Sequence, residues 1–158
     1  MKRSSFLLSL ALAVVLPSPL PAQSTTAMSS SATVITGRFD VKMTPQSAAD
    51  AIVTRMTLDK KYHGPLEATG TGEMLAAMTA VKGSAGYTAI EKVAGKLAGR
   101  EGTFYLQHSG IMDRGAPKLA ITVIPDSGTG ELTGLTGKMD IQIAVDGTHT
   151  YVFEYMLP

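Results

Sequence analysis

The chain has 158 residues, which is the size of one domain. It contains no cysteine, which excludes disulfides and thiol chemistry, and its 14 basic residues nearly balance its 13 acidic ones. The basic residues are scattered rather than gathered into a stripe, and this argues against a nucleic-acid partner.

The N-terminus has the pattern of a secretory signal peptide. Lys2 and Arg3 precede the apolar run Phe6–Leu16, and three prolines then lead to Ala22. The run is too short to span a bilayer, which takes about 20 apolar residues. Cleavage is expected after Ala22, or alternatively after Ala27. We therefore expect a periplasmic or secreted protein with no integral membrane segment after cleavage. The expected division is a signal peptide at 1–22, a flexible Ser/Thr-rich leader at 23–33 and one domain at 34–158.

From residue 34 onward, apolar and polar residues alternate in short runs separated by turn residues, which indicates half-buried β-strands. In residues 37–43, for example, Phe39, Val41 and Met43 share one face. Residues 44–50 are expected to form a loop with at most one helical turn. Strands are predicted at 37–43, 52–62, 87–93, 103–108, 119–124, 138–144 and 149–157.

Residues 64–81 are ambiguous, because Glu73–Ala80 has helical propensity while every neighbouring segment reads as strand. We favour a strand, with Gly70 and Gly72 marking a bend or bulge. About eight short strands then leave an all-β fold, either a sandwich or a small antiparallel closed barrel. The 16 glycines favour the barrel, because strongly coiled strands bend at glycine.

Several short motifs occur in order along residues 39–158 and together resemble a known family. The family is a bacterial one of uncharacterised domains, whose members form an allene oxide cyclase-like β-barrel. The resemblance implies a closed barrel of about eight antiparallel strands. It implies no activity, and no catalytic residue of the plant cyclases aligns with this chain. The motifs are Gly72-Glu73-Met74-Leu75, Gly83-Ser84-Ala85-Gly86-Tyr87, Gly99-Arg100, Leu106-Gln107-His108, Pro125-Asp126-Ser127-Gly128-Thr129-Gly130-Glu131-Leu132 and Phe153-Glu154-Tyr155.

Motifs for zinc hydrolases, nucleotide loops and dinucleotide binding are missing, so we expect neither a metal nor a cofactor. Three histidines remain to be placed. In an up-and-down barrel His108 and His149 lie at one rim and His63 at the opposite one, which argues against a shared three-histidine metal site. His108 and His149 either form a pair at one mouth or are independent rim residues bonded to backbone.

Glu91 is the candidate catalytic carboxylate. It alternates with Tyr87, Ala89 and Val93, so it is expected to point inward if Lys92 faces water. Burial raises the pKa of a carboxyl group, which would prepare a general acid or base, with His108 assisting. Arg100, at the start of the next strand, is expected at the same rim, where it would form a structural ion pair with Glu91.

The expected interior also contains candidate ligand-pocket residues. Phe104 and Leu106 share a face with His108, and three tyrosines need partners for their hydroxyls inside the barrel. This set either lines a pocket or fills the core, since an eight-stranded barrel is just wide enough for one small ligand. Nine methionines would suit an adaptable pocket. The predicted pocket residues are Tyr87, Phe104, Leu106, Tyr151 and Tyr155.

Three functions fit the sequence. The first is a barrel that binds a small apolar or amphipathic molecule, and the second is a cofactor-free isomerase or cyclase that uses the interior carboxylate. The third is a structural or assembly module. The sequence leaves catalysis undecided, and a homo-oligomer remains open.

Overall fold

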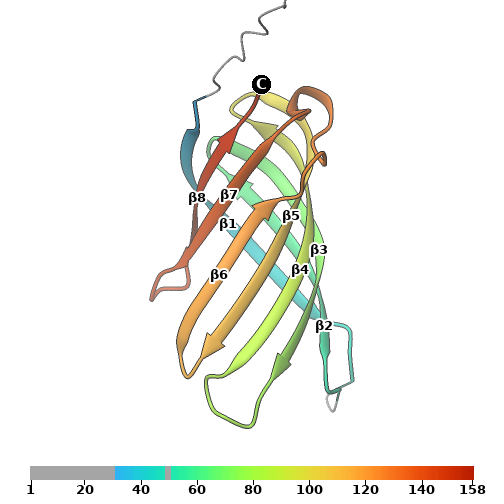
Figure 1. Ribbon diagram of the computed structural model, residues 1–158, viewed down its shortest axis with the longest axis vertical. Coiled ribbons are helices and arrows are strands. Elements are labelled where there is room, and N and C mark those ends of the chain that lie inside the picture. Colours follow the sequence, from blue (N-terminus) through green and yellow to red (C-terminus); the bar gives the residue numbers. More distant parts are fainter. Residues whose placement is uncertain (1–30, 49–50) are drawn as a thin grey trace, which may run out of the picture.

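Eight strands of the computed structural model, which describes residues 31–48 and 51–158, pair in sequence order into one closed barrel (Figure 1). All neighbouring pairs are antiparallel, and β1 pairs with both β2 and β8, which closes the sheet. The predicted all-β closed barrel is thus confirmed over the sandwich. The strands are β1 (Thr33–Pro45), β2 (Thr54–His63), β3 (Leu66–Met78), β4 (Ala85–Leu97), β5 (Arg100–Asp113), β6 (Ala116–Val123), β7 (Thr136–Ile143) and β8 (His149–Met156), with a 3₁₀ turn, η1 (Gly130–Leu132), between β6 and β7.

The ambiguous segment 64–81 is a strand, as favoured. β3 pairs with β4 without interruption, from Leu66 opposite Leu97 to Met78 opposite Ala85. It pairs as regularly with β2, so of the bend or bulge expected at Gly70 and Gly72 the bulge is wrong. Pairing on both edges outweighs the helical propensity of the segment, because each residue gains ladder hydrogen bonds and cross-strand contacts on both sides.

The observed β4 and β5 are longer than the predicted strands 87–93 and 103–108. Their hairpin turns at Ala98 and Gly99, both with positive φ, and pairing continues up to these two residues. The expected loop at 44–50 begins as strand through Pro45, and residues 49–50 lie outside the described part. The predicted signal peptide and most of the leader also lie outside it. Within the described part, no helix is long and apolar enough to cross a membrane.

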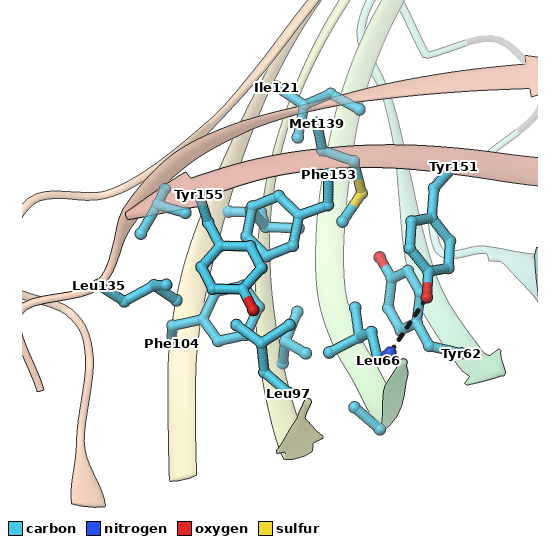
Figure 2. Close-up of a cluster of buried hydrophobic side chains, with 14 of the residues drawn as sticks. Tyr62, Leu66, Leu97, Phe104, Ile121, Leu135, Met139, Tyr151, Phe153 and Tyr155 are labelled. Atoms are coloured by element: carbon cyan, nitrogen blue, oxygen red, sulfur yellow. Dashed lines mark hydrogen bonds between the residues drawn. The ribbon is translucent and has the colours of Figure 1, made fainter. Parts of the chain in front are cut away.

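One end of the barrel is filled by large apolar side chains (Figure 2). The rings of Phe104 and Phe153 stack with centroids 5.9 Å apart, and Leu132 and Leu135 from the β6–β7 connection close this end. Burying a Leu or Phe side chain contributes about 1.5–3 kcal/mol. The filled end therefore supplies most of the core, whose members include Leu66, Leu97, Phe104, Leu132, Leu135, Phe153 and Tyr155.

The opposite end is open. β7 and β8 end earlier there than β3, β4 and β5, whose hairpins extend beyond the rim (Figure 1). The inward-facing register continues into this end on β1 and β7, but its apolar side chains are exposed there, with 53% of Met43 and 64% of Ile143 accessible. The barrel is therefore filled at one end and hollow at the other.

Candidate functional site

A cluster of four buried polar side chains lies at the boundary between the filled and the open end. Its centre is the carboxylate of Glu91, which is 0% exposed. Lys60 Nζ lies 2.7 Å from Oε2 of Glu91, and His108 Nε2 lies 3.1 Å from the same oxygen. The hydroxyl of Tyr62 donates to Oε1 at 2.7 Å. One carboxylate is thus held by three side chains from β2 and β5, two strands that do not pair with each other.

Strand parity explains how these groups meet. Lys60 and Tyr62 lie two residues apart on β2, so both face inward, as do Glu91 on β4 and His108 on β5. β3 lies between β2 and β4, and it must let the side chains reach across. Gly70 provides the space, because a Cβ there would overlap Oε1 of Glu91. The glycine that suggested a bulge is therefore required by the position of the carboxylate.

Electrostatics keep Glu91 ionised. Burial raises the pKa of its carboxyl group, but the His108 hydrogen bond, the charge and hydrogen bond of Lys60 and the Tyr62 hydroxyl together lower that pKa below its ordinary value. Burial, followed by the neighbouring negative charge of Glu91, raises the pKa of Tyr62. Among the described residues, no buried side-chain nitrogen or oxygen lacks a hydrogen-bond partner. The cluster is a buried ion-pair network in which both oxygens of Glu91 accept hydrogen bonds.

A cavity of about 290 Å³ lies directly above this cluster in the open end. Lys60 and His108 contribute to its lining, whereas Glu91 does not. Larger but shallow hollows occur on the outer surface, such as one beside Arg38 and Thr150. The twelve lining residues of the mouth cavity contain no acidic side chain, and they are Phe39, Val41, Met43, Leu58, Lys60, Met74, Tyr87, Ala89, His108, Ile141, Ile143 and His149.

The structure separates the residues predicted for the pocket. Tyr87 and His108 line the mouth cavity. Phe104, Leu106 and Tyr155 lie inside the barrel as predicted, but they belong to the packed core and do not line this cavity. Tyr151 is also in that core, where its hydroxyl accepts a hydrogen bond from the Leu66 amide at 3.2 Å (Figure 2).

The expected ion pair between Glu91 and Arg100 does not form. Arg100 is exposed at the β4–β5 turn, and its guanidinium donates to the Pro158 carbonyl at 3.4 Å. Glu91 lies opposite Leu106 in mid-strand, because β4 continues to Leu97 before the turn. The carboxylate does point inward, but Lys60 is its partner, and the raised pKa expected from burial is reversed by that partner and by His108.

Lys60 and Tyr62 were missed by sequence reasoning. Their signal was present, because the alternation that places Leu58 on the inner face of 52–62 places both of them there too. A lysine is normally assigned to the outer face, since its ammonium needs water or a partner. The missing information was the distant carboxylate that provides this partner.

Strand counting correctly places His108 and His149 toward the same end, but the expected rim position of His108 is wrong. His108 is buried in the middle of β5 and bonds to Glu91 rather than to His149 or backbone. His108 and His149 both line the mouth cavity, and the His149 ring lies 5.1 Å from the ring of Phe39. His63 lies outside that cavity, where Nε2 is 2.8 Å from the exposed carboxylate of Asp40. In the described ranges, no three His, Asp or Glu side chains converge as metal ligands do.

Two comparisons match nearly the whole barrel. The model of a family described as "Protein of unknown function (DUF3224)" matches residues 35–155. A crystal structure of a protein with unknown function from the DUF3224 family of Shewanella oneidensis MR-1 is 54% identical, with a TM-score of 0.76. That match covers 81% of this chain and 98% of the other. None of the curated proteins matches.

Proposed function

Because this chain belongs to the DUF3224 family, which is described as of unknown function, we infer its function from the barrel itself. We propose that the protein binds one small amphipathic molecule in the mouth cavity. The observation that carries this proposal is the combination of apolar walls with a polar floor formed by Lys60 and His108. Such a pocket buries an apolar body and orients it through a few fixed polar groups.

The chemistry of the walls supports a small ligand, whereas the volume does not favour one. The cavity of about 290 Å³ falls just below the roughly 300–1,000 Å³ of small-molecule pockets. Met43 and Met74 contribute flexible, polarizable side chains, which adapt to ligands of irregular shape. Ala89 contributes a methyl group at the wall, and a larger residue there would occupy the ligand's volume.

Calorimetric titration with three octyl-chain probes, octanol, octanoate and octylamine, tests the proposal. We expect at least one probe to bind once per chain, and Ala89→Leu to weaken that binding by about tenfold or more because its side chain enters the cavity. Gln107→Leu is the matched control, since Gln107 faces outward beside His108. Absence of binding by all three probes, or equal binding by both variants, would reject the mouth cavity as the site.

A cofactor-free isomerase is the second candidate, and one observation favours it. His108 lies between a buried carboxylate and the cavity, an arrangement that orients an imidazole to accept a proton from a ligand. The test is deuterium exchange next to the carbonyl of octanone in heavy water. The candidate requires exchange above the buffer rate that is lost in His108→Gln, and exchange at the buffer rate would exclude it.

Export is also proposed, with the pattern around Phe6–Leu16 in support. We propose that the mature protein is periplasmic or secreted and begins near Gln23. Mass measurement of the protein from a fractionated bacterial host tests this directly. A full-length chain in the cytoplasmic fraction would contradict it.

A further inference from the structure

The floor of the mouth cavity has more hydrogen-bond donors than the cluster uses. A lysine ammonium has three N–H groups. Lys60 directs one to Glu91 at 2.7 Å and one toward the Tyr62 hydroxyl oxygen at 3.4 Å. The third N–H has no hydrogen-bond acceptor within the described residues, and Nζ lies 5.0 Å from the centroid of the Phe39 ring. Because Lys60 also lines the cavity, this donor is available to a ligand.

His108 provides a second unused position. Its Nε2 is bonded to Glu91, and no hydrogen bond is formed by Nδ1 within the described residues. Every fully buried side-chain nitrogen among the described residues has a hydrogen-bond partner. Nδ1 has none, so it is not fully buried. The ring lines the mouth cavity, so Nδ1 is accessible from it. Protonated His108 would donate to Glu91 through one nitrogen and to a ligand through the other.

The charges around this floor favour an anion. The lining contains Lys60, His108 and His149 but no Asp or Glu. Glu91 is the acidic group that contacts His108, and its charge is already balanced by Lys60 at 2.7 Å. The other titratable groups nearby are the hydroxyls of Tyr62 on β2 and Tyr87 on β4, which are neutral. Adding one proton to His108 would give the floor a net positive charge.

We propose that the ligand carries a carboxylate whose two oxygens accept hydrogen bonds from Lys60 and from protonated His108, while its apolar chain lies between Met43 and Met74. This inference rests on the proposed binding in the mouth cavity. Two unused donors match the two oxygens of a carboxylate, and a charge-assisted hydrogen bond to each is stronger than a neutral one. Because the complex contains the charged imidazole, binding of a carboxylate to the neutral form of His108 takes up one proton.

The experiment is titration of the full mature chain with octanoate, octanol and octylamine at pH 8, in two buffers with different ionisation enthalpies. We expect the affinity for octanoate to be higher than that for octanol or octylamine by about tenfold or more. The dependence of the binding enthalpy on the buffer should show uptake of about half to one proton for octanoate. Octanol should show none, because a neutral head group does not require the charged imidazole.

Three histidine variants identify the group that takes up the proton. His108→Gln keeps a donor to Glu91 but cannot be protonated, so it should abolish proton uptake and weaken octanoate binding. His149→Gln, in the same cavity, and His63→Gln, outside it, should both retain uptake. The ring nitrogen resonances of His108 in the unmodified protein give an independent measurement, since octanoate should convert them to those of imidazolium.

The outcomes separate this inference from the proposed function. Octanol binding as tightly as octanoate, without proton uptake, would overturn the carboxylate assignment while leaving the mouth cavity as a binding site. Uptake that persists in His108→Gln and disappears in His149→Gln would overturn the assignment to His108. If none of the three probes binds, both this inference and the proposed function fail.

Discussion

Replacing Lys60 with methionine should reverse the pH dependence contributed by Glu91. Lys60 and Glu91 are buried, with 6% and 0% of their side chains exposed. Methionine fills similar volume but removes the positive charge, so Glu91 must either remain as a charge paired only by His108 and Tyr62 or take up a proton. Breaking a buried pair in this way costs about 3–5 kcal/mol.

Protonation of Glu91 sets an upper limit to the free energy of unfolding that Lys60→Met loses at each pH. An unfolded glutamate has a pKa of about 4.3, and each pH unit above it contributes about 1.36 kcal/mol to the cost of holding the carboxyl protonated, or about 3.7 kcal/mol at pH 7. The free energy of unfolding of Lys60→Met should therefore fall by about 3–4 kcal/mol at pH 7. Near pH 4.5 the loss should be about 1 kcal/mol or less.

The pH dependence of stability that Glu91 contributes has opposite signs in the unmodified protein and in Lys60→Met. In the unmodified protein the pKa of Glu91 lies below its unfolded value, so its contribution to stability is complete above about pH 5 and is lost as the pH falls through the folded pKa. In Lys60→Met, burial dominates and raises that pKa. Stability then falls as the pH rises from about 4.5 to 7.

Urea unfolding at several pH values measures these quantities. Lys61→Met is the matched control, because Lys61 is exposed on the same strand and should change stability by about 0.5 kcal/mol or less. The double variant Lys60→Met/Glu91→Gln removes the buried charge and should recover much of the loss at pH 7. A loss in Lys60→Met that is independent of pH, or below about 1 kcal/mol at pH 7, would refute the buried ion-pair network.

Two further substitutions test the packing that surrounds the cluster, both by urea unfolding. Gly70→Ala should destabilise the fold by about 1–3 kcal/mol because its Cβ overlaps the buried carboxylate, whereas Gly86→Ala, with its nearest neighbours at 3.5 Å, should be nearly neutral; equal effects would contradict the proposed role of glycine. Tyr151→Phe should cost about 1–3 kcal/mol by leaving the Leu66 amide without its partner, and a cost no larger than that of the outward-facing Tyr105→Phe would contradict this contact.

Alternation was sufficient to predict the strands and the inner face. Period two is a local property, so the inward direction of Glu91, Phe104 and His108 could be read from their own neighbours. For 64–81, where propensity pointed to helix, the strand prediction came instead from the strands on either side of the segment. The inward directions were predictable because each depends only on the strand that contains the residue.

Depth along the barrel axis could not be predicted in the same way. Tyr87 and Tyr151 both face inward, yet the first lines the open end and the second lies in the filled end. Their depth depends on strand tilt and stagger, which are properties of the closed sheet. This is why the predicted pocket set mixed residues from both ends.

The contact between Lys60 and Glu91 depends on register through an intervening strand. The pairing of β2 with β3, and of β3 with β4, determines which side chains are neighbours across Gly70. No local pattern specifies that register. Arg100 was assigned to Glu91 from proximity in sequence, and the longer strands of the real hairpin separate them.

The most direct test of the mouth cavity uses the methyl resonances of the methionines. Titration of methyl-labelled protein with octanoate and octanol should shift the signals of Met43 and Met74, which line the cavity, in a saturable way. Met139 in the packed core and Met156 on the outer surface should remain unchanged. Shifts confined to Met156, or saturating shifts at neither Met43 nor Met74, would contradict the claim that this barrel holds a ligand in its open end.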